Sequence, residues 1–220
     1  MCPAFPWTVI GAAMNEYLPQ LLLAWSIQAM GIVAPGPSVM LILGVATSRG
    51  RLPALVTAFG VACGSIILAS ATVLGITAIF AEVASVMTAI RFIGAGYLLW
   101  LAYKAFRNAV AAPDLHLRPM PSVSAWRAGM TGFSLQITNP KAILFWLAIA
   151  GVGGVGNAPA PVIALFIAGA FVNSFVGHGA YALLLSSGPV RRVYFRFRRG
   201  IEAALGGFFA VASYTLATAR

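Results

Sequence analysis

A lysine stands inside one of the most apolar stretches of this chain, in the segment "TNPKAILFW". Only nine residues separate Lys141 from the glycine-rich "GVGGVG" that begins at Gly151. Nine helical residues cover about 14 Å, under half of a hydrocarbon core of about 30 Å. Unless the glycines continue the helix and Lys141 anchors at the membrane surface, its ammonium must lie inside the membrane. Ionisable groups there are costly and mark functional sites, and an ammonium can hold a carboxylate.

Prolines interrupt two apolar stretches, and each interruption frees backbone groups. Pro35 and Pro37 flank Gly36 in "MGIVAPGPSVML", and Asn139 and Pro140 directly precede the lysine. Proline removes a backbone donor and obstructs the carbonyl four residues back, so the freed groups need protein or a wet cavity around them. We expect the carbonyls before the first pair of prolines to accept from an ammonium group. The N–H groups that open the helix after Pro140 should hold a carboxylate together with the lysine.

Three further polar residues lie in apolar stretches: Gln28, Gln136 and His178. The glutamines stand in the same two interrupted stretches, where they satisfy either freed backbone groups or a polar ligand, and the backbone role is slightly favoured. His178 shares a helix face with Ser174, four residues earlier. A lone buried histidine is more often a hydrogen-bonded structural residue, and the alternative is a proton-coupling role.

The composition indicates that membrane-spanning helices position these residues. Hydrophobic residues make up 60% of the 220 residues and charged residues 8%, whereas an ordinary soluble domain has about 25% charged residues. The formal net charge is +10, but the basic clusters lie between apolar stretches. A lipid-facing role is therefore favoured over nucleic-acid binding, even for the aromatic-interleaved "RRVYFRFRR". Tyr97, Trp100 and Tyr103 are expected to be anchors at the membrane interface.

We expect an all-α integral membrane protein with six transmembrane helices. The predicted spans lie near residues 17–47, 53–80, 84–106, 127–150, 160–187 and 200–219. The chain divides into an N-terminal extension (1–16), a first three-helix repeat (17–106), a cytoplasmic linker (107–126) and a second three-helix repeat (127–220). Met14 is a second plausible start, which would make residues 1–13 dispensable.

The basic links follow the first, third and fifth spans, so the positive-inside rule puts them in the cytoplasm and both termini on the extracytoplasmic side. Because each half has three spans, the second half enters the membrane from the opposite side, which predicts inverted repeats. Counted from the nearest basic residue of a cytoplasmic link, Pro37, Lys141 and His178 lie about 18, 21 and 20 Å deep at 1.5 Å per residue. The two breaks and the histidine are thus expected at similar depths.

The sequence resembles the LysE/RhtB family of bacterial amino-acid exporters over about residues 14–220. The resemblance rests on "APGP" in the first span, "GVACG" opening the second, "IGAGYLLWLAYKAFR" in the third and "TNPKAILFW" in the fourth. It implies a small multi-pass protein of the bacterial cytoplasmic (inner) membrane that exports amino acids or related metabolites with the proton-motive force. Many members have an aspartate after the second glycine of the second-span motif, where this chain has Ser65. That departure weakens a proton relay through this position and favours His178.

We therefore expect a substrate cavity between the halves, lined by residues 35–37 and 139–141 with Gln28 and Gln136. The four acids all fall at predicted span ends or in links; they are Glu16, Glu82, Asp114 and Glu202. A substrate with an extra cation would want a buried carboxylate, and the sequence offers none. A neutral amino acid or a similar small zwitterion is the expected substrate.

Two other classes of protein remain as alternatives. A membrane-embedded enzyme would use Lys141 or His178 as its catalyst, but no nucleophile with a base and no metal-ligand spacing accompanies them. In either case, Gly60 and Gly64 in "FGVACGS" have the spacing of glycines that pack helices closely. A non-transporting assembly subunit would use its glycines simply to pack helices. We expect no enzyme activity, no cofactor and no metal. The expected partners are the substrate, protons and membrane lipid, without nucleic acid, and a homodimer is compatible with the sequence.

Overall fold

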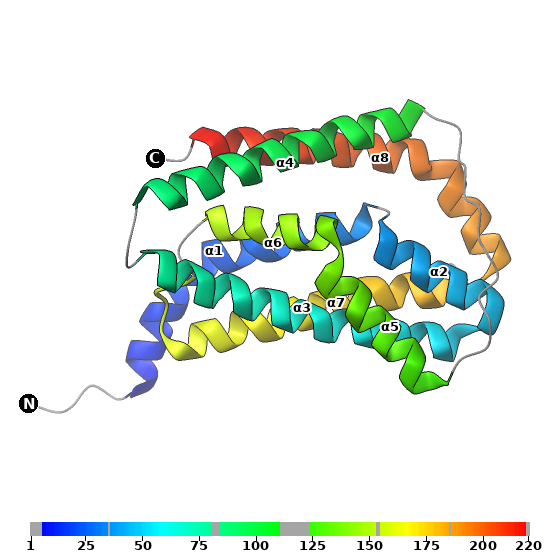
Figure 1. Cartoon of the computed structure of the whole chain (residues 1–220), viewed down its shortest axis with the longest axis horizontal. Coiled ribbons are helices and arrows are strands. Elements are labelled where there is room, and N and C mark those ends of the chain that lie inside the picture. Colours follow the sequence, from blue (N-terminus) through cyan, green and yellow to red (C-terminus); the bar gives the residue numbers. More distant parts are fainter. Residues whose placement is uncertain are drawn as a thin grey trace, which may run out of the picture.

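Figure 1 shows the computed structural model of the chain, which is helical in each element it describes. The structure describes residues 6–34, 36–80, 84–110, 124–152, 155–184 and 186–218. Its helices are α1 (Pro6–Val33), α2 (Pro37–Arg49), α3 (Arg51–Phe80), α4 (Ala84–Val110), α5 (Ala125–Thr138), α6 (Pro140–Val152), α7 (Ala160–Leu184) and α8 (Gly188–Thr218). Pro35, one of the predicted break residues, lies outside the described residues.

Several of these helices have the length and composition of membrane spans. Within the described residues, Arg51–Gly75, Ala160–Leu184 and Arg196–Thr218 are long and apolar enough to cross a bilayer. A fourth candidate is the pair Asn15–Val33 and Pro37–Arg49, which bends by 51° at its break and counts if both parts form one span. The all-α membrane class predicted from the sequence agrees with this result. The full set of six spans stays a prediction.

Several helices extend beyond the spans that the sequence predicts. α1 begins at Pro6, so most of the extension predicted at residues 1–16 is already helical. α8 begins at Gly188 and runs without interruption through the basic "RRVYFRFRR", which the sequence placed in a link ahead of residue 200. Arginine is a good helix former, and Pro189 falls in the first turn, where proline is tolerated. α4 and α5 also extend into the predicted cytoplasmic linker, of which residues 111–123 lie outside the described residues.

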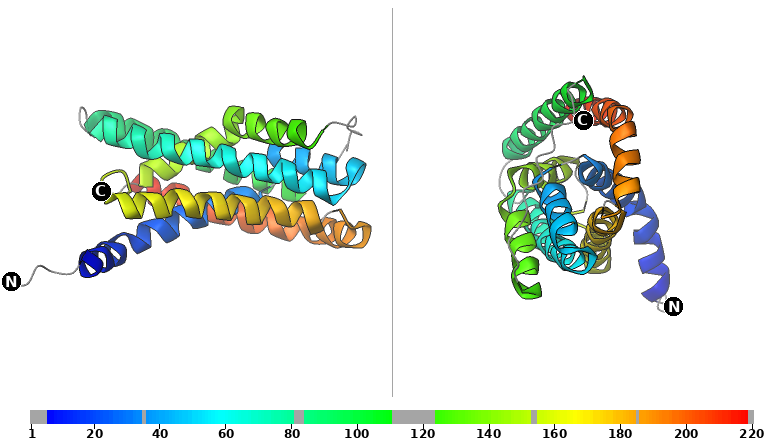
Figure 2. Two further views of the ribbon diagram at one scale, coloured as in Figure 1. Left: turned by 90° about the horizontal axis from the view of Figure 1, so that it is seen from below. Right: turned by 90° about the vertical axis from the view of Figure 1, so that its right-hand side faces the viewer.

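Most of the helices run along the long axis of the molecule, while α5 and the first turns of α8 are inclined to it, and α4 and α8 lie side by side (Figures 1 and 2). The C-terminal ends of α2, α4 and α7 lie at the same end of the bundle as the N-terminal ends of α3, α5 and α8. That end carries basic residues of the links predicted to be cytoplasmic, including Arg49, Arg51, Arg107, Arg127 and Arg192. The grouping agrees with the predicted orientation, which itself stays a prediction.

The two halves of the chain follow the same order of elements. In each half, two shorter helices separated by a break precede two long helices, α3 and α4 in the first half and α7 and α8 in the second. Figure 1 shows that each helix of the first half runs opposite to its counterpart in the second. An inverted repeat requires these directions. The repeat itself stays a prediction.

Close packing of α3 against α5 brings the second half's break into the core. A methyl group added at Gly60 would lie 1.9 Å from the carbonyl oxygen of Gly129, and one added at Gly64 would lie 2.7 Å from Cβ of Gln136. The expectation that Gly60 and Gly64 pack helices closely is confirmed. The side chain of Gln136 therefore lies directly against Gly64, at the interface between α3 and α5.

Candidate functional site

Both helix breaks occur where the sequence places proline. α2 begins at Pro37 and α6 at Pro140, and proline is favourable at the first helical position because its missing N–H would have no partner there. The two breaks contact each other: the amide of Asn139 donates to Oγ of Ser38 at 3.3 Å. The structure therefore brings together the two motifs that the sequence singled out, in the centre of the bundle.

Lys141 crosses from the second break to the first. Its ammonium donates to the carbonyl oxygen of Gly31 at 3.0 Å and to that of Ala34. The hydroxyl of Tyr181 donates to the neighbouring carbonyl of Val33 at 2.8 Å. A helix C-terminus carries a partial negative charge and unpaired carbonyls, so a lysine is a favourable cap there. Lys141 and Tyr181 thus cap the C-terminal end of α1 by donating to its last carbonyls.

This arrangement differs from the predicted division of roles. The freed carbonyls were expected to await a substrate ammonium, but in this structure they bind the ammonium of Lys141. The N–H groups at the start of α6 are also largely satisfied, because the side chain of Asn139 accepts from the Lys141 N–H at 3.0 Å and its carbonyl accepts from Ile143. An ammonium has three donors and two are used here, so Lys141 keeps one N–H for a ligand.

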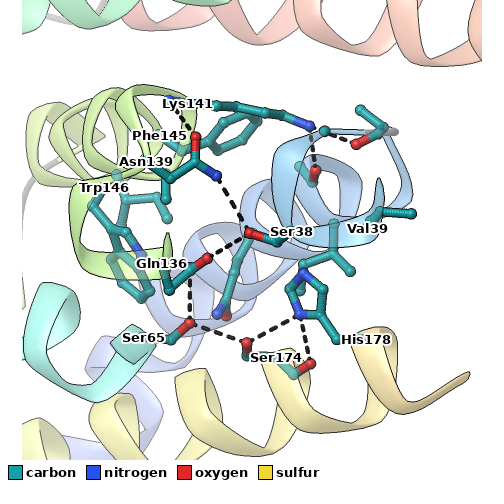
Figure 3. A pocket seen from close by; sticks show the side chains of 17 residues that line it. Ser38, Val39, Ser65, Gln136, Asn139, Lys141, Phe145, Trp146, Ser174 and His178 are labelled. Carbon is teal, nitrogen blue, oxygen red and sulfur yellow. Dashed lines mark hydrogen bonds between the residues drawn. The ribbon is translucent and has the colours of Figure 1, made fainter. Parts of the chain in front are cut away.

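A continuous chain of polar side chains leads from the second break to His178 (Figure 3). All its members are buried. Successive hydrogen bonds of 3.0–3.3 Å join Asn139, Ser38, Gln136, Ser65, Ser174 and His178. Sequence reasoning identified Gln136, Asn139, Ser174 and His178 but gave no role to Ser38. Ser65, the position of the family departure, lies in the middle of this chain.

His178 is oriented by its own helix. Its Nδ1 lies 2.9 Å from the carbonyl oxygen of Ser174, one turn earlier, and a carbonyl can only accept. Nδ1 therefore carries the proton, and Nε2 is the proton acceptor of the ring. His178 also lines a small cavity together with Val39 at the start of α2. The ring is held in one orientation at the end of the polar chain.

Gln28 connects α1 to α7 instead of satisfying the break. Its amide donates to the carbonyl oxygen of Ala170 at 2.9 Å and its oxygen accepts from Asn173 at 3.0 Å. Asn173 also donates to the carbonyl oxygen of Trp25 at 2.9 Å. Gln28 was expected to satisfy backbone groups freed by the prolines. It does contact the backbone, but the carbonyl of Ala170 belongs to the interior of α7 and not to a break. The side chain still lines the small cavity.

Two cavities meet at the breaks. The smaller, of about 60 Å³, extends from Lys141 to His178 and includes Gln28 and Gln136. The larger, of about 240 Å³, extends from Lys141 toward α4 and α8. Since a water molecule takes up about 30 Å³ of liquid, the smaller cavity holds only a few waters and the larger has room for a small amino acid. Four residues line both cavities: Ala34, Gly36, Asn139 and Lys141.

The larger cavity contains a carboxylate that sequence reasoning placed outside the core. The sequence predicts Glu202 at the end of a span, but its side chain is 2% exposed and lines the larger cavity. The reason is that α8 begins at Gly188, so Glu202 lies several turns inside the helix and packs toward α4. The premise that the protein has no buried carboxylate is therefore wrong. A cationic substrate is not excluded on that ground.

Aromatic residues of α4 line the larger cavity as well. Tyr97 is buried and donates to the carbonyl oxygen of Lys141 at 3.2 Å, so its predicted role as an interface anchor is wrong. Its ring stacks on Trp100 at 5.5 Å, and Nζ of Lys104 lies 5.0 Å from the Trp100 ring centroid. A cation above an aromatic face is stabilised by the ring's quadrupole. Spacing in α4 places Tyr97, Trp100 and Lys104 on one side of the helix. Packing against α6 buries Tyr97, whereas Trp100 and Lys104 stay exposed.

A bundle of apolar helices with a buried polar centre defines an integral membrane protein. The chain belongs to the LysE type translocator family, whose family model matches residues 29–220. The Threonine efflux protein of Escherichia coli (strain K12) is 27% identical over 191 residues, which cover 84% of this chain and 90% of that protein. The resemblance drawn from the motifs is thereby confirmed.

Other relatives carry different substrates in their names. The Leucine efflux protein of Klebsiella pneumoniae is 27% identical over 177 residues, which cover 80% of this chain and 81% of that protein. The Cysteine/O-acetylserine efflux protein of Salmonella choleraesuis is 31% identical over 129 residues, covering 58% and 62%. No solved structure matches the chain.

Proposed function

We propose that this protein is a secondary transporter that exports a neutral amino acid or a similar small zwitterion across the bacterial inner membrane, driven by the proton-motive force. The names of the relatives support such a substrate, since threonine, leucine and cysteine are zwitterions without a further charge at neutral pH. One observation carries the proposal: Lys141 stands in the wall between two cavities, at the point where two helix breaks meet.

The contacts of Lys141 suggest how a zwitterion is recognised. A substrate carboxylate accepts the N–H that Lys141 has free and draws the ammonium away from α1. The substrate's own ammonium then takes the carbonyls of Gly31 and Ala34, so the broken end of α1 keeps a cationic cap. After this exchange the substrate carboxylate is paired with Lys141, and the substrate ammonium is paired with the carbonyls at the end of α1. It also opens the wall that Lys141 forms between the two cavities.

The proposed orientation places the basic end of the bundle in the cytoplasm and both termini outside. The larger cavity extends from the breaks toward Lys104, near the basic end of α4. Substrate therefore enters the larger cavity from the cytoplasm, and the smaller cavity beyond Lys141 lies on the exit path. Rocking of one half against the other, which separates the two contacting breaks, gives alternating access.

His178 is the proposed proton-coupling residue, because its Nε2 is a proton acceptor at the far end of the polar chain. We expect replacement of His178 by glutamine to flatten the pH dependence of efflux, since glutamine keeps an amide donor but does not titrate. The measurement is the efflux rate from loaded cells or vesicles between about pH 5 and 8. An unchanged pH profile would move proton coupling to another residue.

The proposed function is tested with purified protein in lipid vesicles. Vesicles containing labelled L-threonine or L-leucine receive an imposed pH gradient, and the labelled amino acid that crosses the membrane is counted. We expect a gradient-dependent flux that exceeds the flux of L-lysine and vanishes when the gradient is dissipated. Absence of gradient-dependent flux for every neutral amino acid tested would contradict a transport function of this kind. A larger flux of L-lysine would contradict the neutral substrate.

A further inference from the structure

Glu202 is a buried carboxylate that the mechanism above leaves unused. Its side chain is 2% exposed, and its Oε1 has no hydrogen-bond partner among the described residues. The nearest cation is Arg198, one turn earlier in α8, whose Nε lies 3.8 Å from this oxygen, beyond hydrogen-bonding distance. A buried acceptor without a donor is costly. Because Glu202 lines the larger cavity, a ligand in that cavity can supply the missing donor.

Charged groups from three helices surround this carboxylate. Arg198 acts from α8, Lys104 from α4 and Lys141 from α6, and the amide of Asn108 faces it from α4. Lys104 and Lys141 line the cavity together with Glu202, so the lining carries two cations and one anion. A ligand that brings only a cation meets net repulsion. A ligand that brings only a carboxylate leaves Oε1 of Glu202 without a donor, because the hydrogen bond from Asn108 does not satisfy that oxygen.

We propose that the larger cavity is the first binding site of the exported zwitterion, with Glu202 accepting from its ammonium and the two lysines holding its carboxylate. This inference rests on the proposed function and names the residue that recognises the α-ammonium group. The volume of about 240 Å³ suits a small amino acid, since it corresponds to roughly eight waters at about 30 Å³ each. Apolar lining residues, among them Leu144 and Phe209, face the substrate's side chain.

The site also suggests a path toward Lys141. Lys104 is exposed and rests on Trp100 near the cytoplasmic end of α4, so it meets an arriving carboxylate first. Lys141 lies at the inner end of the same cavity, beside Gly36 and Asn139. The carboxylate passes from the outer lysine to the inner one while the ammonium stays on Glu202. Transfer of the ammonium to the α1 carbonyls then completes the exchange at the breaks.

The test is ligand binding to the purified, full-length protein, measured by titration calorimetry. The probes are L-threonine, L-leucine, their N-acetyl derivatives, which lack the ammonium, and their methyl esters, which lack the carboxylate. We expect the wild-type protein to bind at least one parent amino acid about tenfold or more tightly than either derivative, because each derivative leaves one buried charge unpaired.

The variant Glu202→Gln removes the charge and keeps the shape. It should lose about tenfold or more in affinity for the parent amino acid and leave the affinity for the N-acetyl derivative unchanged within about twofold. Glu16→Gln is the matched control, since Glu16 is exposed in α1, and it should bind like the wild type. If the variant does not accumulate, the comparison of the three kinds of probe on the wild-type protein still tests whether the site requires both the ammonium and the carboxylate.

Several results would overturn the site. For the wild type they are equal binding of the parent and N-acetyl forms, or no binding of either parent amino acid. For Glu202→Gln they are an unchanged affinity for the parent amino acid, or an equal loss of affinity for the parent and N-acetyl forms. Normal binding by the variant with loss of only the pH-gradient dependence of flux would make Glu202 a proton-coupling residue instead. If wild-type vesicles show gradient-dependent flux of the amino acid but the binding results contradict the Glu202 site, the proposed function still stands. Wild-type vesicles without flux would refute the function itself.

Discussion

Replacement of Lys141 by methionine is expected to reduce export by about a hundredfold or more, because it removes the charge-assisted hydrogen bonds to the substrate carboxylate. Methionine preserves most of the apolar stem that packs beside Gly36. The carbonyls of Gly31 and Ala34 lose their donor, which costs about 1–3 kcal/mol each if no water replaces it. The variant should therefore remain in the membrane, with somewhat lower abundance. The measurement is efflux of labelled amino acid from loaded cells, normalised to the amount of protein in the membrane.

Arg127→Met serves as the control for Lys141→Met. Arg127 is an exposed cation on α5, in the same half of the chain, and it does not line either cavity. We expect this control to export at the wild-type rate. Normal export by Lys141→Met would reduce Lys141 to a structural cap of α1 and would remove it from the substrate site.

Replacement of Gly36 by alanine is expected to slow export by about tenfold or more, without loss of the folded protein. The added methyl group would lie 2.9 Å from Cδ and 3.0 Å from Nζ of Lys141. The backbone of Gly36 is extended, with φ of −143° and ψ of −175°, so alanine adopts it without strain. The clash therefore falls on the flexible end of the lysine and displaces its ammonium from the α1 carbonyls.

The control for Gly36→Ala is Gly75→Ala in α3, where an added methyl group meets no atom within 4 Å. Alanine is a better helix former than glycine, so this control should accumulate at least as well as the wild type and export normally. Both variants are compared by efflux rate and by abundance in the membrane. Wild-type export by Gly36→Ala would show that the position of the lysine beside this glycine does not matter for transport.

The helix breaks could be predicted from the sequence because proline acts locally. Proline is unfavourable inside a helix and favourable at its first position, so Pro37 and Pro140 mark the starts of α2 and α6, whereas Pro19 is tolerated inside α1. Charge counting in the links also gave similar depths for the two breaks, and the structure places them in contact. Local rules and membrane geometry were sufficient for this part of the site.

The partners of the site residues could not be predicted, because they depend on packing between distant segments. Lys141 caps a helix that ends more than 100 residues earlier in the chain. Glu202 looked like a span-end residue because the arginines before it resemble a link, whereas they continue one helix from Gly188. The burial of Glu202 can be recognised only when the packing of α4 against α8 is known.

The hydrogen bonds between helices that the serines of the polar chain make could not be predicted for a related reason. A serine in an apolar helix can satisfy itself on the carbonyl four residues earlier, as Ser65 does on Val61 at 3.3 Å. Its second hydrogen bond, to Ser174 at 3.0 Å, exists only because α3 and α7 pack together. Ser38 acquires its role in the same way from Asn139 and Gln136.

In the proposed mechanism the two helix breaks meet inside the membrane and must move apart for substrate to pass. This movement can be tested by cross-linking Ser38→Cys with Asn139→Cys, in a chain whose own cysteines are replaced by serine, because these two side chains are in hydrogen-bond contact. We expect a mild oxidant to join the breaks in vesicles and stop the flux of labelled amino acid, and a reductant to restore it. Failure of the cysteines to cross-link would show that the breaks do not meet, and undiminished flux through the cross-linked protein would show that they need not move.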